Sequence, residues 1–291
     1  MSRLVSYPVD LHMHSRFSDG LHTPEELTRM ARKLCLHAVA LCDHDTLDGL
    51  SAMADAVKAS SGEDSRKLDF IPAVELSCGA DSNTHILGYG VDADNARLLS
   101  ELEAARNRRQ KRMETMIQQM TDLGARFSDD AIQRLLIPGT GRAHMARELI
   151  SLGMVNTMQQ AFDRYLGAGK PGYVSMERLS AADGIRILRE AGALPVLAHP
   201  MRLRLPDEAR IALMEELVSA GLAGVEAWHP SADKRQAMQL DRWARRKGLL
   251  VTGGSDFHGD PNTSVSMARM PSGWTAWQDD LQALQESCAK S

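Results

Sequence analysis

The sequence predicts an α/β fold, a closed or nearly closed β/α barrel interrupted by a helical insertion. Short apolar runs rich in β-branched residues alternate with longer amphipathic runs, as strands alternate with helices around a parallel sheet. The alternation stops between about Asp94 and Lys170, where no strand pattern occurs. At 291 residues, the chain is long enough to bury a full core.

Strands are expected at the buried apolar runs 9–12, 38–42, 70–75, 84–89, 194–198, 224–228 and 249–252. Helices are expected at 24–36, 47–60, 181–191, 207–220, 232–247 and 276–288. The first helix has the clearest start, because Thr23 is a suitable N-cap, Pro24 follows at the first helical position and Glu26 completes a capping box.

The insertion is expected to begin with one long charged helix that covers about 98–124. It divides the chain into a first barrel part (1–95), a helical lid over the substrate (96–172) and a second barrel part (173–291). The basic run 106–112 is interpreted as a solvated helix face balanced by nearby glutamates, although one side of it could face a nucleic-acid chain.

Composition excludes several classes of protein. The net charge of −4 argues against a protein that holds duplex DNA by bulk charge. No signal-peptide pattern and no apolar run of about 18 residues occur, so a cytoplasmic protein without a membrane span is expected. The four cysteines lack CxxC spacing and are expected to be reduced thiols.

Polar side chains gather where the expected strands end, which is where parallel β/α folds build their active sites. Any one of these residues could be a structural histidine or a turn cap, but their shared position predicts a multinuclear metal site. One or both of Asp43 and Asp45 are expected to orient His44, whereas His22 and His37 are expected at the surface. The residues expected at this rim are His12, His14, Asp19, His44, Glu75, His85, His199, His229, Asp256 and His258.

These motifs resemble the PHP (polymerase and histidinol phosphatase) family. The matching segments are HMHSRFSDG (12–20), CDHDTLDG (42–49), the Glu75 strand with His85, AHP (198–200) and GSDFHG (254–259). The resemblance implies a distorted (β/α)7 barrel with up to three divalent ions. It implies one ion held by His12, His14, Glu75 and Asp256, a second by Glu75, His85 and His199, and a third by Asp19, His44 and His258.

Two insertion segments, GRAHMAREL (141–149) and YLGAGKPGYV (165–174), resemble the family branch of nucleoside-3′,5′-bisphosphate phosphatases and 5′-to-3′ exonucleases of short RNA. Imidazole and carboxylate ligands without thiolate suit Mn²⁺ first, with Fe²⁺, Zn²⁺ and Mg²⁺ as alternatives. The candidates to hold the phosphate that is not cleaved are Arg142 with the neighbouring His144, Lys170, Arg202 and, less strongly, Arg204. His229 and Asp256 are the catalytic candidates; His229 would contact the scissile phosphate or donate a proton to the leaving oxygen.

The expected activity is removal of the 3′-phosphate from a nucleoside 3′,5′-bisphosphate such as adenosine 3′,5′-bisphosphate. Exonuclease action on short 5′-phosphorylated RNA uses the same chemistry and stays open as an alternative. Histidinol phosphatase activity and a non-catalytic PHP module are further alternatives. The oligomeric state is left open by the sequence.

Overall fold

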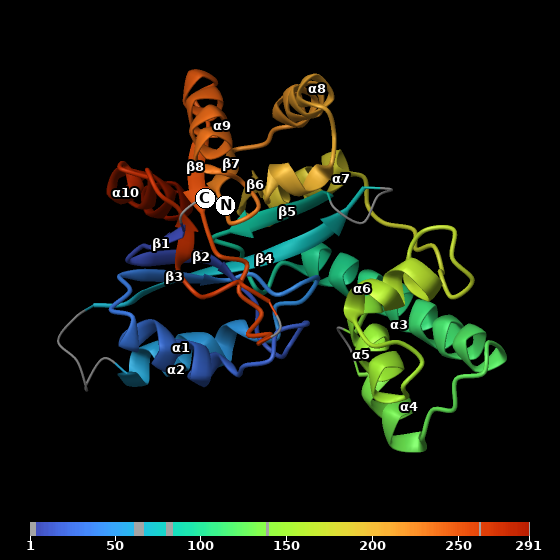
Figure 1. Cartoon of the computed structure of the whole chain (residues 1–291). Helices are drawn as coiled ribbons and strands as arrows, with labels where there is room; N and C mark the ends of the chain where they lie inside the picture. The colour runs from blue at the N-terminus through green and yellow to red at the C-terminus, as the bar shows by residue number, and fades with distance from the viewer. Residues whose placement is uncertain (1–3, 61–66, 80–83, 138–139, 262, 291) are drawn as a thin grey trace. The chain divides into compact units, whose positions relative to one another are not determined.

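The computed structural model describes residues 4–60, 67–79, 84–137, 140–261 and 263–290. The chain forms two compact units. Unit 1 comprises Met1–Leu99 and Arg178–Ser291, and unit 2 comprises Ser100–Glu177. Figure 1 shows the strands in unit 1 and the helices of unit 2, which are labelled α3 to α6.

The main sheet of unit 1 has seven strands in the order β2-β3-β4-β5-β6-β7-β8. The strands are β2 (Val9–Met13), β3 (Ala38–Leu41), β4 (Asp69–Cys78), β5 (Thr84–Tyr89), β6 (Leu194–Leu197), β7 (Gly224–Trp228) and β8 (Leu250–Gly253). The segment after β8 pairs with β2, because the Asp256 N–H donates to the His12 carbonyl at 2.8 Å and the His14 N–H donates to the Phe257 carbonyl at 3.0 Å. The sheet is therefore a nearly closed barrel.

Strand β5 runs antiparallel to both of its neighbours, so the expectation of an all-parallel sheet is wrong at this position. Only residues 79–83 separate β4 from β5, which is too short for the helical crossover that two parallel strands need. The reversal puts the start of β5 at the edge where the parallel strands end. His85 consequently lies at the same rim as the residues that follow those strands.

Strand β2 shows how the sequence divides its side chains between the two faces of the barrel. All five residues are buried, and strand side chains alternate in direction. Val9, Leu11 and Met13 therefore share one face and pack into the apolar core, while Asp10 and His12 share the other. A polar set buried on one face of a strand needs partners there, and the rim supplies them.

Helices surround the sheet, with α1 and α2 on one side of unit 1 and α7 to α10 on the other (Figure 1). The Thr23 capping box is confirmed, since Thr23 accepts from the Glu26 N–H and Glu26 accepts from the Thr23 N–H. Two three-residue strands, β1 (Leu4–Ser6) and β9 (Arg269–Pro271), form an additional antiparallel pair that the sequence pattern was too short to predict. The helices are α1 (Pro24–Lys33), α2 (Leu50–Ala59), α7 (Ala181–Glu190), α8 (Asp207–Ser219), α9 (Lys234–Arg246) and α10 (Trp277–Cys288).

Unit 2 has its own core, built largely from methionine and leucine side chains such as Met116, Met120 and Leu149. Helix α3 (Ala96–Asp122) starts in unit 1 and continues through unit 2. The described part of unit 2 contains no strand, as expected. Its other helical segments are α4 (Asp129–Leu135), α5 (Arg142–Ser151), α6 (Met158–Ala161) and the π-helical turn η2 (Phe162–Leu166).

No helix among the described residues is both long and apolar enough to cross a bilayer. The cysteines are free thiols; Cys42 and Cys78 are buried, Cys288 is half-buried and Cys35 is exposed.

Candidate metal centre

The rim of the barrel brings the side chains expected there around one buried carboxylate, that of Glu75 in β4. Glu75 Oε1 lies 2.9 Å from His85 Nδ1 and 3.0 Å from His199 Nε2. Its Oε2 lies 3.3 Å from Nε2 of both His12 and His14, and 3.1 Å from His44 Nδ1. Glu75 itself is fully buried. Five imidazoles thus face a single carboxylate that water does not reach.

Ligand atoms converge into three groups, each with its ligand atoms within 4.8 Å of one another. One group is the expected first set. The group around Asp19, His44 and His258 also contains His14, and the group around Glu75 and His85 contains His44 where His199 was expected. The three groups are His12, His14, Glu75 and Asp256; His14, Asp19, His44 and His258; and His44, Glu75 and His85.

Divalent cations fit these residues, because several buried nitrogen and oxygen atoms of the cluster have no hydrogen-bond partner within the described part of the chain. A buried polar atom left without a partner costs about 1–3 kcal/mol. Seven such atoms belong to residues of this cluster, and bound cations would satisfy those that present a lone pair; His229 Nε2 carries a proton instead. The atoms are His12 Nε2, His14 Nδ1 and Nε2, His44 Nδ1, Glu75 Oε2, His199 Nδ1 and His229 Nε2.

The imidazoles do not share one protonation state. Burial lowers the pKa of His44 and of His199 to about 4, so both rings are neutral at pH 7 and can donate a lone pair to a metal. Burial opposes a charge on His14, but the Asp256 and Glu75 carboxylates outweigh it and raise the pKa of His14 to about 10. A cation bound to His14 must therefore displace a proton.

Glu226 in β7 is a residue of the site that the sequence reasoning missed. Its carboxylate is fully buried and accepts from His12 Nδ1 at 3.0 Å and from the His199 backbone N–H at 2.8 Å. The bond to Nδ1 leaves His12 Nε2 facing Glu75 and Asp256, the arrangement that carboxylates give to metal-binding histidines. A glutamate inside the apolar run GVEAW could have signalled it, since a buried carboxylate needs partners.

Two buried aspartates hold the loops that carry site residues. Asp10 accepts from the Ser255 N–H at 2.8 Å and from the Ser255 hydroxyl at 2.5 Å, next to Asp256. Asp43 accepts from the Ser15 N–H at 2.7 Å and from the hydroxyls of Ser15 and Ser18 at 2.6 Å each, next to Asp19. Asp43 therefore positions this loop, where an effect on the His44 ring was expected.

Asp45, the other aspartate expected to orient His44, accepts from the Ser77 N–H at 2.8 Å and so connects its loop to the end of β4. The two histidines expected at the surface differ in their exposure to solvent. His37 is exposed. His22 is half-buried, and its ring stacks on Phe257 with centroids 5.8 Å apart, because the loop after β8 folds back over the start of α1.

His229 lies at the end of β7 and is buried, with a defined tautomer. Its Nδ1 accepts the Ser231 backbone N–H at 2.9 Å, so the ring proton is on Nε2. Nε2 points toward Asp256 Oδ2, at 3.7 Å. His229 thus offers a hydrogen-bond donor beside the cluster, and its bond to Ser231 prevents the ring from turning.

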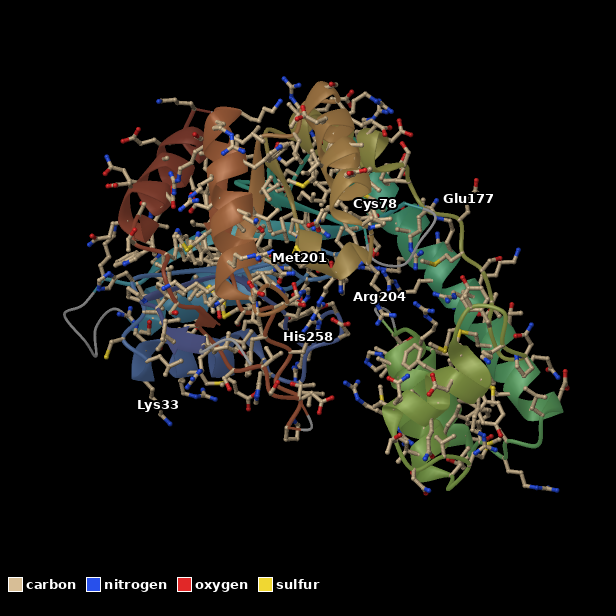
Figure 2. The ribbon with its side chains drawn as sticks, turned by 45° about the horizontal axis from the view of Figure 1, so that its top comes forward. Lys33, Cys78, Glu177, Met201, Arg204 and His258 are labelled. Carbon is tan, nitrogen blue, oxygen red and sulfur yellow. The ribbon has the colours of Figure 1, made fainter. Side chains whose placement is uncertain are left out.

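Arg202 lies on the turn η3 (Pro200–Leu203), directly after His199. Its Nη1 is 2.6 Å from Asp256 Oδ2, and its side chain is 45% exposed. Arg204 follows the turn and is exposed; Figure 2 labels it together with Met201 of the turn and His258 of the cluster. The non-glycine residues His199 and Arg204, with φ of 30° and 50°, bracket this turn in the left-handed region. Arg202 is therefore a cation that already contacts the cluster.

Three of the expected phosphate-binding residues, Arg142, His144 and Lys170, belong to unit 2. The Arg142 guanidinium lies over the rings of Phe162 at 5.6 Å and Tyr173 at 5.8 Å, and burial lowers its pKa. His144 Nδ1 accepts the Gly141 N–H at 3.2 Å, which caps the start of α5, and Lys170 is exposed. Arg142 is thus held on an aromatic platform.

The chain matches known proteins over most of its length. The family model described as PHP domain matches residues 10–166. A 5′-3′ exoribonuclease of Haemophilus influenzae is 32% identical over 250 residues, which cover 86% of this chain and 89% of that protein. A 3′,5′-nucleoside bisphosphate phosphatase of Chromobacterium violaceum is 34% identical over 253 residues, which cover 86% and 87%.

The solved structure of a Chromobacterium violaceum amidohydrolase, with bound sulfate and no metal, superposes with a TM-score of 0.82. It is 30% identical, and the match covers 95% of this chain and 96% of that one. The arrangement of the barrel is therefore shared with a protein whose structure is known from experiment.

Proposed function

The chain belongs to the PHP domain family and is a phosphoesterase of that family; we propose that it removes the 3′-phosphate from nucleoside 3′,5′-bisphosphates such as adenosine 3′,5′-bisphosphate. The observation that carries this proposal is the convergence of five imidazoles on Glu75, with Arg202 and His229 beside them. The relative named as a bisphosphate phosphatase supports the choice of substrate.

As part of this proposal, nine side chains hold three divalent ions, with Mn²⁺ the best match to a set of imidazoles and carboxylates without thiolate. Fe²⁺, Zn²⁺ and Mg²⁺ are the alternatives. When bound, such ions acidify a water near neutral pH and balance the charge of a phosphate dianion. The proposed ligands are His12, His14, Asp19, His44, Glu75, His85, His199, Asp256 and His258.

The carboxylates of the proposed ligand set do not balance the positive charge of three divalent ions. Asp19, Glu75 and Asp256 offset only half of the charge that three divalent ions carry. The cluster would therefore attract a dianionic phosphomonoester. Glu226 keeps His12 turned toward the cluster, and Asp10 and Asp43 keep the loops of Asp256 and Asp19 in place. These buried contacts form the site before the substrate arrives.

His229 is proposed to donate a hydrogen bond to an oxygen of the scissile phosphate. Its Nδ1 already accepts the Ser231 N–H, so the ring holds one proton, on Nε2. Giving that proton to the leaving oxygen would leave an imidazolate, which is an unfavourable product near neutral pH. Of the two roles expected for His229, the geometry therefore favours contact with the phosphate over proton donation. A hydrogen bond there stabilises the charge that develops on the phosphoryl oxygen.

Arg202 was expected to hold the phosphate that is not cleaved, but because its guanidinium contacts Asp256 of the cluster it is proposed to bind the scissile phosphate. The guanidinium contacts Asp256 Oδ2, while Oδ1 of the same carboxylate faces His12 and His14 of the first group. Because the side chain is 45% exposed, it can leave that contact without a large rearrangement. A guanidinium binds two phosphate oxygens at once, which favours it over an ammonium group.

The phosphate that is not hydrolysed is assigned to the cations of unit 2, namely Arg142, His144 and Lys170. The aromatic platform of Phe162 and Tyr173 under Arg142 supports this assignment, since it holds the guanidinium in one position. The assignment extends to the base, for which unit 2 is proposed to act as a lid.

One assay panel with Mn²⁺ tests the proposed function. It compares adenosine 3′,5′-bisphosphate, a 5′-phosphorylated oligoribonucleotide, histidinol phosphate and an aryl phosphate. We expect the highest kcat/KM for the bisphosphate. A higher value for histidinol phosphate, or no turnover of any compound, would contradict the proposal.

A second candidate function is 5′-to-3′ exonuclease action on short RNA, which the 32% identical exoribonuclease relative favours. Both reactions break the ester at a 3′-oxygen of a nucleotide that carries a 5′-phosphate. Rapid stepwise shortening of the oligonucleotide, with little turnover of the bisphosphate, would make the exonuclease the main activity.

A further inference from the structure

A cavity of 330 Å³ lies between helices α8 and α9 of unit 1, away from the cluster around Glu75. None of its lining residues is one that we propose to bind the metal ions or the substrate of the metal centre. Its walls come from the two helices and from Met201 of the turn η3. The lining residues are Met201, Asp207, Arg210, Ile211, Met214, Arg235, Gln236, Gln239, Leu240, Arg242, Trp243 and Arg246.

The helix spacing explains why this cavity has an apolar part and a cationic part. On α8 the lining positions are three or four residues apart, so they share one face of the helix. That face contributes Ile211, which is 45% exposed, and Met214. Helix α9 adds the buried side chains of Leu240 and Trp243. Together with Met201 they form an apolar surface that a planar or aliphatic group would cover.

The charge of this cavity is not balanced by the protein. Arg210 is buried and pairs with Asp207, the one carboxylate of the lining. Arg235, Arg242 and Arg246 have no ion-pair partner among the described residues. Two cations at the end of α9 that face elsewhere do have partners: Arg245 pairs with Asp241 and Asp280, and Lys247 pairs with Glu215. Three unpaired guanidiniums on one cavity stand out in a chain whose net charge is −4.

We propose that this cavity binds a nucleoside phosphate at a second site, separate from the metal centre. The planar base would cover the apolar surface, where the thioethers of Met201 and Met214 adapt to its shape. The phosphate would bind Arg242 and Arg246, since guanidiniums form paired hydrogen bonds with phosphate oxygens. The proposal does not depend on which substrate the metal centre hydrolyses.

The position of Met201 gives such a ligand a route to the catalytic residues. Met201 contributes to the cavity and lies next to Arg202, which contacts Asp256, and two residues after His199. A ligand that moves Met201 moves the same short turn that carries Arg202. We therefore infer that occupancy of this cavity alters turnover at the metal centre.

Calorimetric titration with adenosine 5′-monophosphate (AMP) tests the site on the full-length, Mn²⁺-loaded protein. The double variant Arg242→Glu/Arg246→Glu should weaken one binding event by about tenfold or more, because it reverses two charges at the phosphate. Arg242→Gln/Arg246→Gln should weaken it less. Arg29→Glu, at an exposed arginine of α1, is the matched control and should bind as the wild type does.

Equal affinity in the wild type and the double Glu variant would overturn the proposal. Equal weakening by Arg29→Glu would overturn it too, because that result would indicate an effect of bulk charge alone.

His199→Ala separates this proposal from the proposed function, because it should remove AMP binding at the metal centre and leave AMP binding at the cavity unchanged. In hydrolysis of an aryl phosphate, AMP should change kcat for the wild type. It should change only KM for the double variant, and a kcat effect that persists there would refute the coupling.

Discussion

Replacing Glu226 by glutamine perturbs the metal centre without touching a proposed ligand. Each oxygen of the carboxylate accepts one hydrogen bond, from His12 Nδ1 at 3.0 Å and from the His199 N–H at 2.8 Å. Glutamine has nearly the same volume but only one acceptor oxygen, so its amide group must face one of these donors. The variant therefore loses one buried hydrogen bond and places two donors against each other.

The expected loss of Mn²⁺ affinity follows from the role of the hydrogen bond between Glu226 and His12 Nδ1. His12 loses the partner that fixes its tautomer and its orientation toward Glu75 and Asp256. Removing such a partner of a metal-binding histidine lowers metal affinity or activity by about 10- to 100-fold, or about 1.4–2.7 kcal/mol. We expect Mn²⁺ affinity to fall by this factor, with kcat recovering in part at high Mn²⁺.

The assay is a titration of metal-free protein with buffered Mn²⁺, followed by binding and by phosphatase rate, with thermal unfolding measured in parallel. Glu216→Gln makes the same chemical change at an exposed position of α8 and serves as the control. If Glu226→Gln binds Mn²⁺ within about twofold of the control, its role in orienting His12 is refuted.

Three other changes test separate parts of the site. His199→Ala should lose metal and activity while its circular dichroism stays that of the folded chain; unchanged turnover would remove His199 from the site. Arg202→Ala should raise KM for the bisphosphate and for an aryl phosphate by similar factors, because both carry the phosphate that Arg202 is proposed to bind; an unchanged KM for the aryl phosphate would contradict that role. Mn²⁺ affinity should rise with pH up to about pH 10, because the raised pKa of His14 means that a proton must leave before a cation binds; competition titrations at several pH values measure this, and a flat profile would contradict it.

The parts of the site that the sequence predicted share one property. They follow strands of a β/α pattern, and the carboxyl ends of such strands meet at one edge, so a list of strand ends is also a list of neighbours. His12, His44, His199 and Asp256 were found in this way. His85 joins them for a different reason, since it precedes rather than follows the core of its strand. Its position depends on the reversal of β5, which the alternation of elements does not encode.

Glu226 was missed because its role depends on contacts across the barrel. It belongs to no motif, and its two partners lie 214 and 27 residues away in the chain. The hydrogen bonds that Asp43 accepts from Ser15 and Ser18 likewise join residues that are distant in the chain. A strand pattern shows that such a carboxylate is buried, but only the packed structure shows which donors reach it. The half-buried position of His22 likewise depends on the loop after β8, which is distant in sequence.

The central claim is that the imidazoles around Glu75 form a site for cations. Anomalous diffraction from crystals soaked in Mn²⁺ tests it most directly, because it locates each ion independently of any activity. We predict anomalous peaks that lie between Glu75 and the rings of His12, His14 and His44. Peaks confined to other parts of the molecule, or none at all in this cluster, would contradict the claim.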